Sequence, residues 1–221
     1  MKMLDYIKSQ RKRIFMSLFG VLISGVCVGF MKVAAFGVDP FQVLVSGLDS
    51  AIPIDFGMLY VLINAVLLLF SLTADRRNIG IATFINLFLL GYVVDFTRGM
   101  LDSFFPAPGM ALRIGFLAFG IIVLCVGSSL YMTANLGVST YDAVAIVMSQ
   151  KWKWGPFKYV RICTDLVCVV LGGLLIYLSS GSVSQIAASI GVGTIVTAFF
   201  MGPLISFFNE KIAKPMLEET K

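Results

Sequence analysis

Apolar residues occur along this chain in long runs, with little of the polar alternation typical of soluble helices or strands. A helix needs about 20 apolar residues to cross a hydrocarbon core of about 30 Å. Runs of about this length span Ile14–Phe36, Phe56–Thr73, Ile79–Thr97, Arg113–Asn135, Val160–Ser179 and Ile186–Phe208. The pattern therefore predicts an all-α, polytopic transmembrane helical bundle, with residues 1–221 forming a single membrane domain.

Two shorter apolar runs, Pro40–Ile52 and Tyr141–Gln150, lie between the first and second long runs and between the fourth and fifth. At about 1.5 Å per residue, each helix would rise only about 15–20 Å, which is too short to cross a bilayer. We therefore predict about six spans plus two half-length helices.

The basic residues gather at the ends of the apolar runs, as expected for cytoplasmic loops. With six crossings and a cytoplasmic N-terminus, the inner side holds Lys2, Lys8, Arg11, Lys12, Arg13, Arg76, Arg77, Lys151, Lys153, Lys158, Arg161, Lys211, Lys214 and Lys221. Lys32, Arg98 and Arg113 fall on or near the outside. Eight crossings fit the charges equally well, so length decides for six. We expect a multi-pass protein of the bacterial cytoplasmic (inner) membrane with both termini cytoplasmic.

Composition excludes several classes of function. Hydrophobic residues make up 58% of the chain and charged residues 13%, and the net charge of +5 is explained by topology rather than by nucleic-acid binding. The chain has no His, and no Cys or carboxylate group has the spacing of a metal site. No phosphate-binding loop or nucleophile constellation occurs either. We expect no enzyme activity, no catalytic residues, no metal and no cofactor.

The chain also resembles itself. Shifted by 100 positions, identical residue types recur for Arg13, Ile14, Phe19, Gly20, Val26, Ala34, Gly37 and Val38. A second block recurs at a shift of 111, and the order long span, short helix, span, span is kept. This predicts an internal two-fold repeat, 13–97 and 113–208. With three crossings in each unit, the second copy would be inverted, an arrangement common in secondary transporters, although duplication can also merely enlarge a bundle.

Each unit carries a helix break, Gly37-Val38-Asp39-Pro40 in the first and Gly137-Val138-Ser139-Thr140 in the second. Gly ends one helix, and Asp or Ser caps the next. Pro40 suits a first helical position, and Asp142 completes a variant of a capping box. Free N–H groups and the positive end of a helix dipole favour an anionic group, although such caps also begin ordinary helices.

Polar residues inside the spans complete the candidate site. Asn64 and Asn86 have polar counterparts in the second half, and interhelical hydrogen bonds explain them as well as substrate contact does. The candidate substrate-binding residues are Gly37, Asp39, Pro40, Gly137, Ser139, Thr140, Asp142, Asn64 and Asn86.

Ionisable residues in the spans are candidates for coupling or ion pairing. Asp95 precedes Arg98 by about one turn near the end of its span, so it is either a functional group or the partner of Arg98 in an ion pair near the surface. Asp165 lies deeper, one turn beyond Arg161, and either pairs with this arginine or faces a polar cavity.

The chain resembles the YczE/YyaS/YitT family of bacterial integral membrane proteins, particularly its YczE branch. The resemblance rests on Gly37–Phe41, Gly80–Thr83, Gly91–Asp95, Gly137-Val138, Arg161 with Asp165, and Gly193-Thr194, and covers roughly Arg13 to Phe208. Ala82-Thr83 departs from the Gly-Thr usual in the first half. The resemblance implies a bacterial membrane protein with a role in transport or in supporting other membrane processes.

The broken helices favour a secondary transporter or exporter of a small solute, with the lipid bilayer as its surroundings. The alternative is a non-transporting accessory or regulatory membrane protein that acts through a partner. The sequence leaves open whether the chain forms a homo-oligomer or binds another membrane protein, and it does not identify the substrate.

Overall fold

The computed structural model describes residues 10–180 and 183–218, and its described elements are all helical. Six helical segments within these ranges are long and apolar enough to cross a membrane, so the predicted polytopic bundle is confirmed. They are α2 (Arg11–Ala34), α4 (Phe56–Ala74), α5 (Ile81–Phe104), α6 (Met110–Thr133), α8 (Phe157–Ser180) and the interrupted pair α9 (Val183–Ser189) and α10 (Val192–Phe208).

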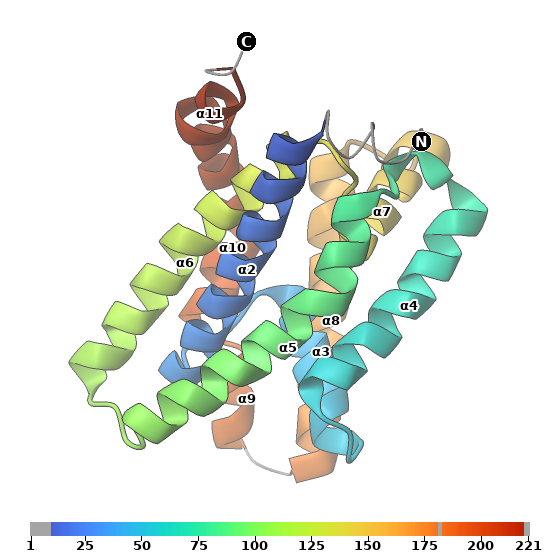
Figure 1. Cartoon of the computed structure of the whole chain (residues 1–221). Coiled ribbons are helices and arrows are strands. Elements are labelled where there is room, and N and C mark those ends of the chain that lie inside the picture. Colours follow the sequence, from blue (N-terminus) through green and yellow to red (C-terminus); the bar gives the residue numbers. More distant parts are fainter. Residues whose placement is uncertain (1–9, 181–182, 219–221) are drawn as a thin grey trace.

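The two predicted half-length helices are present, and each extends over only part of the bundle. The first is α3, Pro40–Ala51; the second is α7, Thr140–Ile146, which continues as a π-helical turn, Val147–Lys151. After α2 the chain turns back to the middle of the bundle, and α3 runs from there to one end (Figure 1). Helix α7 runs from the middle to the opposite end. The remaining elements are η1 (Arg76–Asn78), η3 (Asn209–Ala213) and α11 (Lys214–Glu218).

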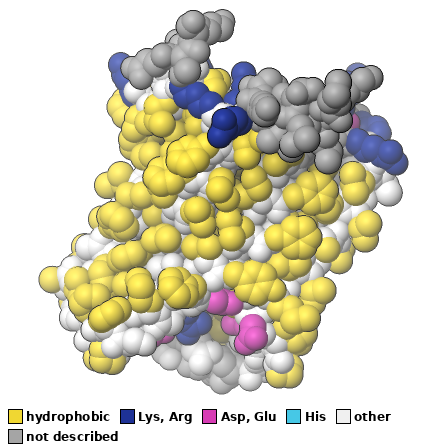
Figure 2. All heavy atoms as spheres, viewed as in Figure 1, with side chains coloured by type: hydrophobic (Ala, Val, Ile, Leu, Met, Phe, Trp, Pro, Cys, Tyr) yellow, Lys and Arg dark blue, Asp and Glu magenta, His cyan; other side chains and the backbone are white. Residues whose placement is uncertain are grey.

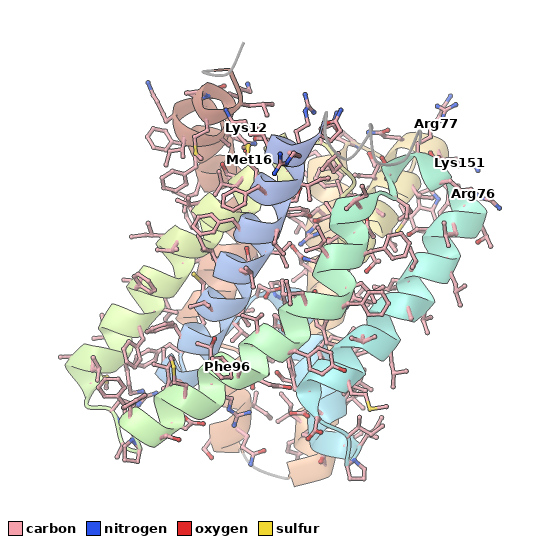
Figure 3. All side chains as sticks on the ribbon, viewed as in Figure 1. Lys12, Met16, Arg76, Arg77, Phe96 and Lys151 are labelled. Carbon is pink, nitrogen blue, oxygen red and sulfur yellow. The ribbon has the colours of Figure 1, made fainter. Side chains whose placement is uncertain are left out.

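The outer surface of the bundle has the distribution of a membrane protein. Hydrophobic side chains cover most of the face shown in Figure 2, and Lys and Arg gather toward one end. This basic end carries Lys12, Arg76, Arg77 and Lys151, and both ends of the described chain lie there (Figures 1 and 3). Lys2, Lys8 and Lys221, which the sequence also assigns to the inner side, lie outside the described residues.

Helices α2 and α6 cross at very close range in the centre of the bundle. A Cβ atom placed on Gly20 would lie 2.6 Å from the carbonyl oxygen of Gly127, and one placed on Gly127 would lie 2.7 Å from Oγ of Ser24. Helices α3 and α8 also pack through glycines, because a Cβ on Gly47 would lie 2.5 Å from the carbonyl oxygen of Gly172. Small residues thus let the backbones approach, as is common in membrane bundles.

The last span departs from the prediction of a continuous run over Ile186–Phe208. It is interrupted between α9 and α10 because its backbone pairs with the break after α2. The N–H of Val38 donates to the carbonyl of Ser189 at 3.2 Å, and the N–H of Gly193 donates to the carbonyl of Phe36 at 2.8 Å. Polar backbone groups that two broken helices expose at the same depth therefore satisfy one another.

The same pairing occurs at the break after α6. The N–H of Val138 donates to the carbonyl of Asn78 at 3.0 Å, and the N–H of Ala82 donates to the carbonyl of Leu136 at 3.0 Å. Gly37 and Gly137 have φ angles of +99° and +110°, values that L side chains rarely adopt. Each break thus contacts a segment of the other half of the chain in a matching way.

Two arginines make a second matching set of contacts. Arg13 donates to the carbonyl of Ala134 at the end of α6, at 3.1 Å. Arg113 donates to the carbonyls of Ala34 and Ala35 at the end of α2, at 2.8 and 3.1 Å. Because the last carbonyls of a helix lack helical partners, each guanidinium stabilises the end of the other long helix. Arg113, an exception to the charge bias, therefore has a structural partner.

Candidate functional site

The N-terminal ends of α3 and α7 meet in the middle of the bundle. The rings of Phe41 and Tyr141, each the second residue of its helix, stack with centroids 4.8 Å apart and planes 19° apart. The hydroxyl of Thr140 donates a short hydrogen bond to the side-chain oxygen of Asn64 on α4. The positive ends of two helix dipoles are thus brought together inside a membrane bundle.

The predicted caps are present. Asp39 accepts a hydrogen bond from the N–H of Gln42 at 3.4 Å, and the hydroxyl oxygen of Ser139 accepts one from the N–H of Asp142 at 3.0 Å. The predicted variant of a capping box is wrong in one detail. The N–H of Ser139 donates to the hydroxyl of Tyr131 at 2.9 Å, while the carboxylate of Asp142 accepts from the Ser139 hydroxyl at 2.6 Å. The carboxylate of Asp142 can bind the Ser139 hydroxyl because the Tyr131 hydroxyl already accepts the N–H of Ser139.

Asp142 belongs to a partly buried charged cluster centred on Arg161 of α8, whose side chain is 26% exposed. Arg161 pairs at close range with Asp142, and its Nε lies 3.2 Å from Asp165, whose side chain is 7% exposed. Tyr141 donates to Asp165 at 2.7 Å, and Tyr131 donates to Asp142 at 3.0 Å. We call Asp142, Arg161, Asp165, Tyr131 and Tyr141 the central cluster. Its Arg161–Asp165 pair is one of the two arrangements that the sequence left open.

The first turn of α3 is poorer in partners than that of α7. Among the described residues, ion pairs join Arg161 to two carboxylates and Arg98 to Asp102, and Asp39 takes part in none. Oε1 of Gln42, a residue only 3% exposed, is buried and accepts no hydrogen bond from the described chain. The first turn of α3 thus holds a carboxylate outside any described ion pair and a buried oxygen without a donor from the described chain.

Asn64 and Asn86 both belong to this region. The side-chain amide of Asn64 donates to the carbonyl of Tyr60 at 2.8 Å, and the Tyr60 hydroxyl donates to the side-chain oxygen of Asn86 at 3.1 Å. Both asparagines are buried. The bond to Asn86 joins α4 to α5, and the bond from Thr140 to Asn64 joins α7 to α4, so both asparagines make interhelical hydrogen bonds, the first of the two roles that the sequence allows.

Asp95 and Arg98 lie elsewhere, and the ion pair that the sequence allows between them does not form. The N–H of Gly57, at the start of α4, donates to Asp95 at 2.5 Å, and Arg98 pairs with Asp102 at 3.6 Å. The carboxylate of Asp95 thus accepts a hydrogen bond from the start of α4, where backbone N–H groups lack helical partners. Arg98 pairs instead with Asp102, one turn further along α5.

Asp95 and Arg98 line a polar pocket of about 640 Å³ at the end of the bundle opposite the basic residues. Figure 2 shows acidic and basic side chains gathered near this end. The lining also includes Asp49, at the end of α3, and Asp55 and Phe56 at the start of α4. Burial raises the pKa of Asp49 above its ordinary value, against the attraction of Lys32, which lowers it. We call this the outer pocket.

A second cavity, of about 490 Å³, lies between α3, α4, α7 and α8. We call it the apolar cavity. Its lining residues are Phe41, Leu44, Ile63, Leu67, Tyr141, Val144, Met148, Trp154, Tyr159, Val160, Cys163, Thr164, Val167 and Cys168. None of them carries a formal charge, although Tyr141 at its inner end belongs to the central cluster.

Four aromatic rings connect the two cavities. Ring centroids are 4.8 Å apart between Tyr141 and Phe41, 5.8 Å between Phe41 and Tyr60, and 6.3 Å between Tyr60 and Phe56. Tyr141 and Phe41 line the apolar cavity, and Phe56 lines the outer pocket. We call this series the aromatic barrier, because its rings fill the space between cavities on opposite sides of the middle.

The sequence prediction missed the tyrosines and Gln42. One signal could have found Tyr141, because the shift of 100 positions that defines the repeat pairs it with Phe41. Tyr131 and Gln42 carry no such mark, since a tyrosine or glutamine in an apolar helix does not reveal its partners. All the predicted substrate-binding residues lie at the breaks or in the hydrogen-bonded network around them.

Comparisons with known proteins agree with the family resemblance. Residues 11–210 match the family described as "Family of unknown function (DUF6198)". An uncharacterized protein of Haemophilus influenzae is 27% identical over 206 residues, covering 93% of this chain and 87% of that protein. No solved structure matches the chain.

Two Bacillus subtilis proteins are also similar. The uncharacterized membrane protein YczE is 22% identical over 173 residues, covering 78% of this chain and 74% of YczE. The uncharacterized protein YyaS is 19% identical over 202 residues, covering 91% and 94%. Since the family match covers all of the spans, from the start of α2 to just beyond the end of α10, this multi-pass membrane protein belongs to the DUF6198 family, with YczE and YyaS among its relatives.

Proposed function

We propose that the protein is a secondary transporter or exporter of a small solute across the bacterial cytoplasmic membrane. The observation that carries this proposal is the meeting of α3 and α7, two half-length helices that approach from opposite ends of the bundle. Their N-terminal turns adjoin the partly buried central cluster. Charged groups are costly inside a bilayer, and in membrane proteins they commonly mark the path of a substrate or ion.

The two cavities support alternating access to this site. The apolar cavity reaches the central cluster from the half that contains α7, and the outer pocket lies at the other end. The aromatic barrier separates them. A change in the tilt of one half against the other would open one route as it closed the other, as in transporters built from related halves.

We also propose the orientation and the inverted repeat as parts of this mechanism. The end with Lys12, Arg76, Arg77 and Lys151 would face the cytoplasm, in keeping with the positive-inside rule. The matched contacts of the two helix breaks, and of Arg13 and Arg113, support a common origin for 13–97 and 113–208. In this arrangement each break is held by the opposite repeat, so that movement of one repeat is coupled to the other.

A ligand screen followed by a flux assay tests the proposal. Purified protein is screened for thermal stabilisation by panels of metabolites and ions, and each stabilising compound is then assayed for uptake into proteoliposomes. We expect at least one compound to stabilise the protein and to be transported. We also expect transport to be lost in Asp165→Asn and kept in the exposed control Asp102→Asn.

The rival function gives a different result. An accessory protein would show no flux with any compound and would co-purify with a stoichiometric membrane partner. That outcome, obtained with folded protein, would contradict the transport proposal.

A further inference from the structure

The apolar cavity has the size and lining of a binding site for a small organic molecule. Its volume of about 490 Å³ lies within the range of about 300–1,000 Å³ typical of ligand pockets. Four of its side chains are aromatic: Phe41, Tyr141, Trp154 and Tyr159. Such a lining favours a ligand with substantial apolar surface, because burial of this surface drives binding.

The cavity opens at the apolar surface of the bundle. Tyr159, Cys163 and Val167 are spaced four residues apart on α8, and all three are both exposed and part of the lining. A helix presents residues at this spacing on one face. A ligand can therefore enter from the hydrocarbon layer, which again selects molecules that partition into lipid.

The inner end of the cavity selects for charge. Tyr141, in the lining, donates to Asp165, and the surroundings also contain Asp142 and Asp39. These three carboxyl groups outnumber the one guanidinium beside them, that of Arg161, which pairs with Asp142 and Asp165. Gln42 adds a buried oxygen without a donor. Since charges interact strongly where water is scarce, this excess attracts a cation and repels an anion.

We propose that the apolar cavity binds a lipophilic organic cation, with its apolar groups among the aromatic side chains and its positive charge toward Tyr141 and Asp165. This inference rests on the proposed function, since it names the substrate class of the same central site. Aromatic faces also stabilise cations directly, which suits an ammonium or phosphonium ion.

Two ions of similar size and opposite charge provide the test. Binding of tetraphenylphosphonium and tetraphenylborate is measured by equilibrium dialysis of the purified full chain in detergent, with protein-free detergent as the blank. We expect saturable binding of the phosphonium at about one ion per chain and no saturable binding of the borate. Equal binding of the two ions, or no saturable phosphonium binding to folded protein, would overturn the inference.

Matched variants locate the site. Cys163→Phe fills the cavity from its exposed margin, so we expect phosphonium to bind at least about tenfold more weakly. The control is Leu174→Phe, on the exposed face of α8 outside the lining, which should leave phosphonium binding unchanged. Asp165→Asn should weaken binding about tenfold or more through loss of one nearby charge. Binding unaffected by Cys163→Phe would contradict the assigned position. A tightly bound lipid that the phosphonium does not displace would show that the cavity is an acyl-chain site instead.

A flux measurement separates this inference from the transport proposal. If tetraphenylphosphonium binds with the expected charge preference but proteoliposomes with the protein move no solute, transport is wrong and the binding site remains. If another solute is transported while the phosphonium does not bind, the cationic substrate class is wrong and transport remains.

Discussion

Helices α3 and α7 begin with similar backbone geometry, and their side-chain surroundings differ. Asp39 and Ser139 each accept an N–H of the first turn, and Gly37 and Gly137 precede them with positive φ. Around α7, however, the carboxylate of Asp142 is held by Arg161 and Tyr131. The corresponding position in α3 is Gln42, whose Oε1 accepts no hydrogen bond from the described chain.

The backbone around the two breaks, which we call the scaffold, is therefore alike in both halves, whereas the charged side chains are not. Matching backbone contacts hold both breaks, so the scaffold depends little on which cap residue is present. The charged side chains are concentrated beside α7, which gives the middle of the bundle an asymmetric field. We therefore expect substitutions of the scaffold to act equally in both halves, and substitutions of charge to act mainly in the second.

The largest expected effect is that of Arg161→Met. It leaves the carboxylates of Asp142 and Asp165, whose side chains are 13% and 7% exposed, without their cation, and loss of one partner of a buried ion pair costs about 3–5 kcal/mol. We expect a large fall in the thermal unfolding midpoint in detergent. The control Arg98→Met breaks a pair whose side chains are 51% and 56% exposed, and it should have little effect. Equal falls for both variants would contradict the importance of the central cluster.

Gly37→Ala and Gly137→Ala test whether the two scaffolds are equivalent. A Cβ on Gly37 would lie 2.6 Å from the nitrogen of Gly191, and one on Gly137 would lie 2.5 Å from the nitrogen of Gly80. Together with the positive φ, this contact should reduce the free energy of unfolding by about 2–4 kcal/mol in each variant. Thermal unfolding should give similar losses, with Gly99→Ala, which meets no neighbouring atom within 4 Å, as the control. A loss confined to one half would break the equivalence.

Asp142→Asn and Asp39→Asn test whether charge matters in one half only. Asp142 accepts charge-assisted bonds, so its substitution should cost about 1.5–3 kcal/mol of stability. Asn caps a helix about as well as Asp, so Asp39→Asn should cost less than about 0.5 kcal/mol. Both values can be measured by unfolding in mixed detergent micelles. A larger loss for Asp39→Asn would reverse the comparison.

Smaller losses than that of Asp142→Asn are expected from Thr83→Val and Thr194→Val. The Thr83 hydroxyl donates to the carbonyl of Val138 at 2.6 Å, and the Thr194 hydroxyl donates to the carbonyl of Ser189 at 3.1 Å. Each substitution removes a hydrogen bond near a break and should cost about 1 kcal/mol. Similar small falls in the unfolding midpoint would support equal scaffolds. No change for Thr83→Val, which joins the two halves directly, would weigh against the interhalf contact.

The bundle could be predicted because hydrophobic length and backbone chemistry decide it. The predicted second span, Phe56–Thr73, differs from α4 by one residue, and Pro40–Ile52 ends one residue beyond α3. The break at Gly191 could not be found in this way. Ile190 and Val192 continue the apolar run on either side, and the interruption arises from hydrogen bonds to residues more than 150 positions away.

The contacts of the site could be predicted within one helix and could not be predicted between helices. Arg161 and Asp165 are four residues apart on one helix, so their pairing follows from helix geometry. The pairing of Arg161 with Asp142 joins two helices, and the spacing of 19 residues gives no sign of it. Asp95 shows that a local partner can also mislead. Arg98 lies one turn away on the same helix, yet the carboxylate of Asp95 binds the N–H of Gly57 at the start of α4.

The central claim is that α3 and α7 enter from opposite faces of the membrane without crossing it. It is tested most directly by labelling with a membrane-impermeant thiol reagent in a chain whose four cysteines are replaced. Single cysteines are introduced by Pro53→Cys beyond α3 and by Lys153→Cys beyond α7, two exposed positions. We expect the first to react only from the outer face and the second only from the cytoplasmic face. Reaction of both from the same face would contradict the account.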